Sequence, residues 1–396
     1  MIKEQIQELS KKIFNDVVAN RRHLHSHPEL SFQEVATSAF VASRLDELEI
    51  PYIKMADTGL VGLIKGTKPA DSEKVIALRA DMDALPIVEA NDVPYKSQNP
   101  GVMHACGHDV HTSSLLGAAT ILSQMKDQFS GTIKLIFQPA EERLPGGASL
   151  MIKEGVLENP KPQAVIGQHV MPLIDAGKVG FRSGKYMAST DELYVTVKGK
   201  GGHGAQPQQN IDPVIITAHI LTALQTLVSR YSDPKSPCVL SFGKVIANGA
   251  TNVIPNEVYL EGTFRAMDET WRAEAHKRMK KMAEGIAESM GGSCEFNIMN
   301  GYPFLINEEK LTAAARSHAE DYLGKENVLD LDIWMAAEDF AYYSQVADSC
   351  FYRLGIRNES KGIVSSVHTP TFDIDESALQ VGPGLMAYLA LKQLGN

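Results

Sequence analysis

Three short, mostly apolar runs constrain the fold of this chain more than any other feature of its sequence. They cover residues 74–80, 132–138 and 164–167. Short apolar runs bounded by polar residues are typical of strands that are buried on both faces. The segments that follow them at 109–125 and 146–154 have helical patterns. Strands that alternate with helices predict an α/β fold around a buried sheet.

Polar side chains follow each of these predicted strands. Asp81 follows the first strand, Glu141 and Glu142 follow the second, and His169 follows the third. Open α/β sheets bind ligands at the carboxyl ends of their strands. Taken alone, Asp81 also suits a turn, and two adjacent glutamates also suit the start of a helix. Taken together, the three strand ends predict a shared site.

The segment M-H-A-C-G-H-D-V-H at residues 103–111 adds a thiol and further imidazoles to this set. Thiolate and neutral imidazole are good ligands for zinc and similar ions. A free cysteine is also common as a small core residue, so Cys106 and His108 alone leave both interpretations open. The metal interpretation gains weight because the chain supplies further candidate ligands.

The candidate metal ligands are too many for one tetrahedral ion, so the sequence predicts two divalent ions that share a bridging ligand. We expect Cys106 to be the bridge and Glu141 to stay free as the general base. Asp81 would not bind a cation itself but would orient a side chain that does. His203, in a glycine-rich segment, would stabilise the developing oxyanion, although it also suits an ordinary turn. The five predicted ligands are Cys106, His108, Glu142, His169 and His368.

A second domain is predicted after residue 184, where half-exposed strands replace buried ones. Strand, helix, strand, strand, helix and strand in this order are typical of a ferredoxin-like α+β unit. We expect residues 185–296 to form this unit as an insertion in a larger domain of residues 1–184 and 297–396. The six predicted elements cover 193–197, 212–229, 239–246, 257–265, 270–290 and 296–299.

Three alternating histidines, His23, His25 and His27, precede Pro28. Neither a carboxylate nor a cysteine is grouped with them in the sequence. We therefore expect a polar turn with local hydrogen bonds there rather than a metal site.

Composition and charge limit the classes of binding partner and the cellular compartment that we expect. The net charge of −10 and the absence of a basic run argue against nucleic-acid binding. No apolar run approaches the roughly 20 residues of a membrane span, and the N-terminal segment does not resemble a secretory signal. The 4 cysteines are scattered, as in proteins of a reducing compartment. These features predict a cytoplasmic protein that acts on small molecules.

Four motifs of this chain resemble those of a known family. They are M-H-A-C-G-H-D-V-H, Q-P-A-E-E, H-P-E-L-S and H-T-P-T-F-D, and they occur in the family's order along the full chain. The family is the amidohydrolase branch of the aminoacylase/carboxypeptidase metallopeptidases, which includes N-acyl-L-amino acid amidohydrolases, hippurate hydrolases and auxin-conjugate hydrolases. The resemblance implies a zinc-exopeptidase-like, three-layer α/β catalytic domain. It also implies an inserted lid that mediates dimer contacts, and hence a homodimer or larger homo-oligomer.

The resemblance assigns roles to individual residues. It places His108 and His169 at one metal and Glu142 and His368 at the other, with Cys106 as the bridge and Glu141 as the base. The metals would be zinc or manganese, and the ligands also suit cobalt or nickel.

Further residues match the family outside the ligand set. Asp81 matches the aspartate of an H-x-D motif in which Arg79 replaces the histidine, and His203 matches the lid histidine. Asn252 and Arg265 match lid residues that contact substrate. Arg265 would pair with an α-carboxylate, although a surface charge is the ordinary alternative.

Three functional hypotheses follow. The first is a dinuclear hydrolase that cleaves the amide of N-acyl-L-amino acids through a metal-bridging hydroxide, with Glu141 as base. The second is a dipeptidase or carboxypeptidase of the same family. The third is a binding protein without catalysis, against which Glu141 argues, because a binder has no use for a free base beside the metals.

Overall fold

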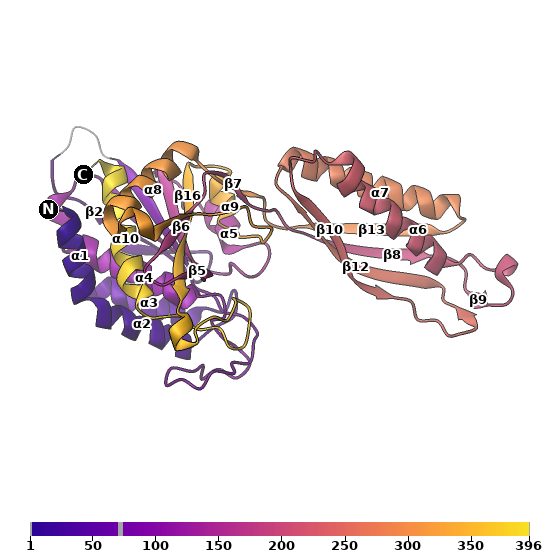
Figure 1. Cartoon of the computed structure of the whole chain (residues 1–396), viewed down its shortest axis with the longest axis horizontal. Helices are drawn as coiled ribbons and strands as arrows, with labels where there is room; N and C mark the ends of the chain where they lie inside the picture. The colour runs from indigo at the N-terminus through magenta and orange to yellow at the C-terminus, as the bar shows by residue number, and fades with distance from the viewer. Residues whose placement is uncertain (1, 70–73, 396) are drawn as a thin grey trace. The chain divides into compact units, whose positions relative to one another are not determined.

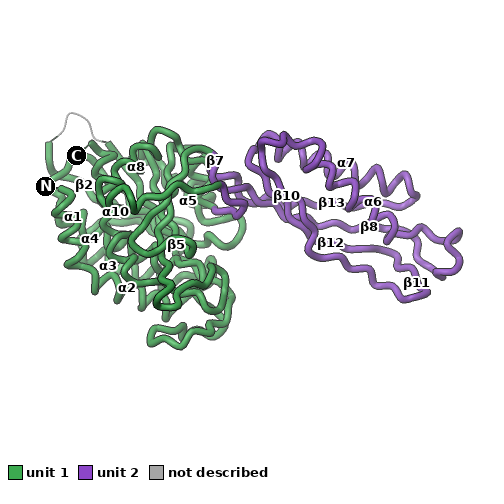
Figure 2. The backbone as a smooth tube through the Cα atoms, viewed as in Figure 1, with its two compact units in different colours: residues 1–184, 306–332, 339–396 green, residues 185–305, 333–338 purple. Residues whose placement is uncertain are grey.

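The computed structural model describes residues 2–69 and 74–395. It divides the chain into two compact units (Figure 2). Unit 1 comprises residues 1–184, 306–332 and 339–396, and unit 2 comprises residues 185–305 and 333–338. The division at residue 184 coincides with the predicted one. Residues 297–305 lie in unit 2 instead, because β13 (Ser293–Asn300) pairs along its whole length with β8 (Asp191–Lys198).

Unit 1 is built on an eight-stranded sheet (Figure 1). The neighbouring strands β4, β3, β5 and β16 run parallel to one another, so their carboxyl ends lie along the same edge. In spatial order, the strands are β1 (Tyr52–Met55), β2 (Gly59–Lys65), β4 (Thr132–Gln138), β3 (Val75–Asp81), β5 (Ala164–Asp175), β16 (Ser349–Arg357), β6 (Val179–Phe181) and β15 (Val328–Asp330).

The three predicted apolar strands are β3, β4 and β5. Every residue of β3 and β4 is buried, as their apolar composition predicts. β5 is longer than expected and extends to Asp175, so His169 lies within the strand rather than after it. The strand continues through His169 because the parallel pairing with β16 extends beyond this residue.

Helices cover both faces of this sheet and make three layers. A side chain at Gly59 of β2 would meet α5, whereas one at Gly62 would meet α3, and these two positions face opposite sides. The predicted three-layer α/β class is confirmed. One layer contains α3 (Val35–Glu47), α4 (His108–Ser123), α8 (Glu309–Leu323) and α10 (Ala378–Leu394), with α1 (Ile2–Lys12) and α2 (Phe14–Ser26) packed against it, and the other contains α5 (Gly147–Lys153) and α9 (Ala341–Ser344).

Unit 2 has the predicted ferredoxin-like order. Its four strands form an antiparallel sheet in the order β10-β12-β8-β13. Alternate residues of β8 are buried, and two helices supply the other half of the core. The remaining elements are α6 (Pro213–Thr226), β10 (Cys238–Ile246), β12 (Glu257–Ala266) and α7 (Glu269–Ser289), with the short strands β7 (Gly184–Met187), β9 (Gly202–His203), β11 (Val253–Ile254) and β14 (Leu305–Asn307).

Within residues 2–69 and 74–395, no helix combines the length and the apolar character that crossing a bilayer requires.

Candidate metal centre

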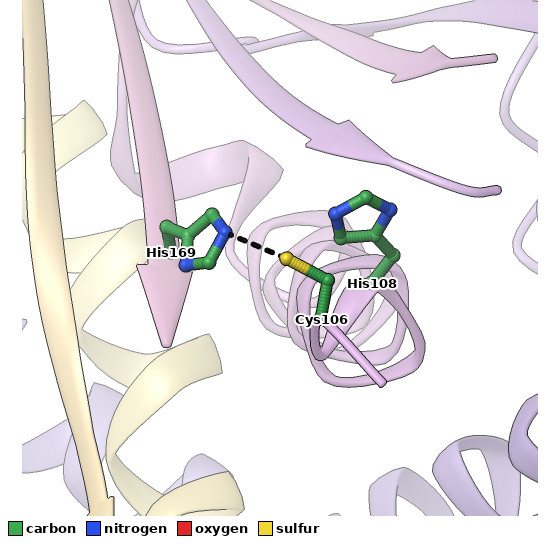
Figure 3. A group of neighbouring side chains, drawn as sticks. All are labelled: Cys106, His108 and His169. Atoms are coloured by element: carbon green, nitrogen blue, oxygen red, sulfur yellow. Dashed lines mark hydrogen bonds between the residues drawn. The ribbon is translucent and has the colours of Figure 1, made fainter. Parts of the chain in front are cut away.

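The predicted ligands meet at the carboxyl edge of the sheet in unit 1. Cys106 and His108 lie at the start of α4 and face His169 on β5 (Figure 3). Gly107, between them, has φ of 85°, and a Cβ there would lie 2.5 Å from a methyl carbon of Val170. Only glycine fits this conformation and this close approach, which brings the start of α4 against β5.

Cys106 is the centre of the cluster. Its Sγ lies 3.5 Å from His169 Nε2 and 3.3 Å from His368 Nε2. His368 Nε2 also lies 3.2 Å from Glu142 Oε1. The donor atoms fall into two groups that share the thiol, one with His108 and His169 and one with Glu142 and His368, each within 4.8 Å. The structure therefore brings all five predicted ligands together.

The two buried histidines can each direct the lone pair of Nε2 at a cation beside Cys106. His108 Nδ1 donates a hydrogen bond to the Asp83 carbonyl oxygen at 2.9 Å, and His169 Nδ1 donates to the Val170 carbonyl oxygen at 2.7 Å. A carbonyl oxygen only accepts, so each neutral ring carries its hydrogen on Nδ1 and a lone pair on Nε2. This is how protein partners orient metal-bound histidines.

Two buried polar atoms of the cluster lack a hydrogen-bond partner among the residues that the structure describes. They are His108 Nε2 and Glu142 Oε1, the second of which makes no hydrogen bond although the predicted ligand atom His368 Nε2 lies 3.2 Å away. Burying such atoms unpaired is costly, and a cation coordinated by both would remove that cost. The donor set and its unsatisfied atoms thus fit divalent metal ions.

The electrostatics of the cluster also favour positive charge. Burial alone lowers the pKa of His108, but Asp81, Asp83 and Glu142 outweigh it and raise that pKa to about 10. Burial, together with Glu142, Glu141 and Asp81, raises the pKa of the Cys106 thiol. Both shifts reflect carboxylates gathered in a site of low dielectric, where bound cations would stabilise the thiolate.

Glu141 lies beside the cluster but in neither group that contains Cys106. Its Oε1 accepts a hydrogen bond from the Asp339 N–H at 3.3 Å, and its Oε2 lies 3.9 Å from His108 Nε2. It also belongs to two further possible groups, one with His108 and Glu142 and one with Glu338 and Asp339. Its position therefore allows the predicted role of a base next to the ligands.

Asp83 is a buried carboxylate that we did not predict as a site residue. It holds the two glutamates and His108 in place. Its two oxygens accept from the N–H groups of Glu141 and Glu142, each at 3.0 Å, and Oδ1 lies 3.2 Å from His108 Nδ1. A second carboxylate, Glu34, accepts from the N–H of Ala140, which has φ of 50°. These bonds hold the bend after β4 in which the two glutamates diverge.

Asp81 does not make the contact that we expected of it. The predicted ligand His108 donates from Nδ1 to the Asp83 carbonyl oxygen, whereas Asp81 Oδ1 lies 3.9 Å from His108 Nε2. Asp81 Oδ1 accepts from His111 Nδ1 at 2.6 Å, and Oδ2 pairs with buried Arg79. His111 Nε2 in turn accepts from the Val170 N–H at 2.9 Å. Because both nitrogens of His111 are used, this ring offers no lone pair to a cation.

The predicted lid residues lie in unit 2 and do not form one group there. His203 Nδ1 accepts from the Ala205 N–H at 3.0 Å, so the neutral ring carries its hydrogen on Nε2 and can donate it. Asn252 is adjacent, with its carbonyl oxygen bonded to the Gly204 N–H. Arg265 lies on β12 eight residues from Glu257, the end of β12 nearest His203. At about 3.3 Å per residue, this is a separation of about 26 Å.

The three N-terminal histidines divide into two kinds. His23 and His27 are exposed, and His27 Nδ1 bonds to the His23 carbonyl oxygen as expected, but His23 lies in the last turn of α2 rather than in a separate polar turn. His25 differs from the expectation because it is buried, with Nδ1 2.8 Å from Asp109 Oδ2 and Nε2 3.2 Å from Glu89 Oε1. Its carboxylate partners are distant in sequence, so the local pattern could not reveal them.

Comparisons with known proteins agree with this site. The chain is 45% identical over 311 residues to an N-acyl-L-amino acid amidohydrolase of Geobacillus stearothermophilus, covering 78% of this chain and 83% of that protein. It is 38% identical over 393 residues to thermostable carboxypeptidase 2 of Saccharolobus solfataricus, covering 98% of each. The crystal structure of the YXEP protein of Bacillus subtilis, a dinuclear metal binding peptidase, matches with a TM-score of 0.83 and 34% identity, covering 98% and 99% of the two chains.

Four parallel strands of a mixed sheet bring candidate metal ligands together at their carboxyl edge, an arrangement that fits a metal-dependent hydrolase. Residues 77–392 match the model of peptidase family M20/M25/M40, and the chain belongs to this family. The predicted resemblance is thereby confirmed, and the chain is a metal-dependent amidohydrolase. The binding-protein hypothesis is set aside.

Proposed function

We propose that this protein hydrolyses the amide bond of N-acyl-L-amino acids, using two divalent cations. Cys106 would bridge them, His108 and His169 would hold one, and Glu142 and His368 would hold the other. The observation that carries the proposal is the arrangement of five donors in two groups around one thiol, in which the buried atoms His108 Nε2 and Glu142 Oε1 make no hydrogen bond. The amidohydrolase relative from Geobacillus stearothermophilus supports the substrate class.

The cations, when bound, would polarise the amide carbonyl and lower the pKa of water from 15.7 toward about 7. Glu141 takes a proton from the attacking water while the water oxygen bonds to the carbonyl carbon. The same carboxyl group then gives the proton to the nitrogen as the C–N bond breaks, which releases the carboxylic acid and the free amino acid. His203 Nε2–H donates to the carbonyl oxygen as negative charge develops there.

The first test is a substrate panel on metal-free and metal-loaded protein. We expect acetyl- and benzoyl-amino acids to be hydrolysed faster than dipeptides. Activity should be lost on dialysis against a chelator and restored by zinc or manganese, because both carbonyl polarisation and water activation depend on the cations. Unchanged turnover in protein shown to be metal-free would contradict the proposal.

A dipeptidase or carboxypeptidase is the second candidate function. It is favoured by the similarity to thermostable carboxypeptidase 2. The two functions differ in what precedes the scissile amide, a simple acyl group or an aminoacyl residue. Dipeptides or longer peptides that are cleaved faster than every N-acyl amino acid in the panel would select this second function.

We also propose that the active enzyme is a homodimer or larger homo-oligomer whose subunits share the site. Arg265 lies about 26 Å along β12 from Glu257, and His203 follows Lys198, the β8 partner of Glu257, so His203 and Arg265 of one unit 2 are too far apart to contact the same N-acyl amino acid. If both contact substrate, one of them must come from a second subunit.

Mixed oligomers test this sharing. Glu141→Gln subunits are co-expressed with His203→Ala subunits, and separately with Arg265→Ala subunits. We expect one of the two mixtures to recover roughly a quarter of wild-type activity. Random pairing makes about half of the dimers mixed, and in each mixed dimer one of the two sites combines two intact contributions. Failure of both mixtures to exceed the parent variants would show that each subunit acts alone.

A further inference from the structure

A buried ion network lies behind the metal centre, and its central residue is Arg21 on α2. Arg21 is 0% exposed. Its Nε donates to Asp109 Oδ2 at 2.8 Å, its Nη2 donates to Asp373 Oδ1 at 2.9 Å, and its guanidinium lies 4.7 Å from the centre of the Tyr95 ring. A buried guanidinium is costly unless it is paired in this way, so its position depends on both carboxylates.

The two carboxylates belong to two segments that carry predicted ligands. Asp109 immediately follows His108 at the start of α4, three residues after Cys106. Asp373 lies five residues after His368, in a segment of residues 364–377 without helix or strand. One side chain therefore joins the His108 segment to the His368 segment.

The His368 segment depends on such ties more than the other ligand segments do. The side chain of His368 is 52% exposed, against 13% for Glu142 and 0% for His108. The φ of His368 is 62°, a conformation that non-glycine residues adopt only when their surroundings impose it. Its N–H donates to the Ala105 carbonyl oxygen at 2.7 Å.

The rest of the segment is held from the side of Arg21. Tyr95 Oη donates to Asp373 Oδ2 at 2.9 Å, and Asn91 Nδ2 donates to the Phe372 carbonyl oxygen at 2.8 Å. Arg21 and Tyr95 thus hold one carboxylate between them. Loss of that carboxylate would remove the two side-chain bonds at Asp373, leave the segment its bonds to Phe372 and Pro370, and keep the buried Arg21–Asp109 pair intact.

We propose that Arg21, acting through Asp373, is a positioning residue for the cation group of Cys106, Glu142 and His368. This inference rests on the proposed function, since it requires that group to hold a cation. Loss of Asp373 should therefore weaken cation binding at this group and not at the other. The group of Cys106, His108 and His169 contains no residue of the 364–377 segment.

The experiment compares Asp373→Ala with a matched control, Asp321→Ala. Asp321 also lies in unit 1 and also has one basic and one tyrosine partner, Lys3 and Tyr388, but it contacts no ligand segment. Metal-free proteins are titrated with Zn²⁺ against a competing chelator. We expect two binding events in the wild type and in Asp321→Ala. In Asp373→Ala, one event should weaken about tenfold, as for other residues that orient metal ligands.

His368→Ala identifies which event belongs to which group. We expect it to abolish the event that Asp373→Ala weakens, and the double variant to lose nothing more. Arg21→Lys keeps the charge but not the fork of donors, so it should weaken the same event and, because Arg21 also holds Asp109 beside His108, the other event to a smaller extent. Equal weakening of both events, or Asp373→Ala indistinguishable from Asp321→Ala, would overturn the proposal. If the wild type binds no Zn²⁺, or if His368→Ala binds like the wild type, the proposed function itself fails.

Discussion

Replacing Glu141 by glutamine is expected to lower kcat about 10³-fold while both cations stay bound. A positioned general base contributes roughly 10²–10⁴-fold, and the amide of glutamine takes no proton from water. Glutamine keeps the shape of the side chain and an oxygen that can accept from the Asp339 N–H. The change therefore removes the base with little disturbance of its surroundings. Activity on an N-acyl amino acid and metal content are measured on the same sample.

Glu154→Gln is the matched control for this experiment. Like Glu141, Glu154 accepts a hydrogen bond from a backbone N–H, that of Ala56, but it lies outside the cluster of ligands. It should retain wild-type turnover and metal content. Glu141 also forms a possible group with His108 and Glu142. Loss of one cation in Glu141→Gln would thus identify Glu141 as a ligand and contradict its role as a free base.

The parts of the site that the sequence reveals are those with a local signal. Glu141 and Glu142 follow the apolar strand β4, His169 follows the apolar run A-V-I-G within β5, and the parallel pairing of β3, β4 and β5 brings these positions together. Cys106 and His108 stand out because a thiol and an imidazole flank a glycine. In each case, a short pattern and the general rule for open α/β sheets suffice.

The residues that the sequence analysis missed depend on tertiary contacts. Asp83 organises the ligands His108 and Glu142, yet in the sequence it reads as one more aspartate after Asp81. Its place two residues further along the run D-M-D was the only available signal. Arg21 meets Asp373 across 352 residues of sequence, and no local pattern encodes such a pair. Buried charges find their partners only in the folded chain.

The end of the second domain and the end of β5 also differ from the predicted ones. The predicted boundary at residue 296 cuts β13, because it lies at the first residue of the strand predicted over 296–299, which leaves residues 297–300 in the other domain. Their pairing with β8 keeps them in unit 2. Likewise, β5 continues past His169 because it pairs with β16, which lies almost two hundred residues further on. Strand length is set by such partners as much as by composition.

Replacing Cys106 by alanine is expected to have the broadest effect, because both groups of donors share its sulfur. A shared ligand stabilises two cations at once, so its removal should weaken both binding events by at least about 100-fold, the upper end of what residues behind the ligands contribute. Hydrolysis should fall with them, since carbonyl polarisation and water activation both depend on the cations. Zn²⁺ binding to metal-free protein and turnover at a fixed free metal concentration measure the two losses.

Cys350→Ala is the matched control, because it removes a buried thiol that is not a predicted metal ligand. Cys350 is a buried free cysteine of β16 in the same unit, and it belongs to none of the donor groups. Both substitutions remove one sulfur from a buried site and should lower the free energy of unfolding of the metal-free protein by a similar amount, about 1 kcal/mol. Only Cys106→Ala should also lose metal affinity. If Cys106→Ala loses one binding event and leaves the other at wild-type affinity, the sulfur binds one cation only and the two groups are independent sites.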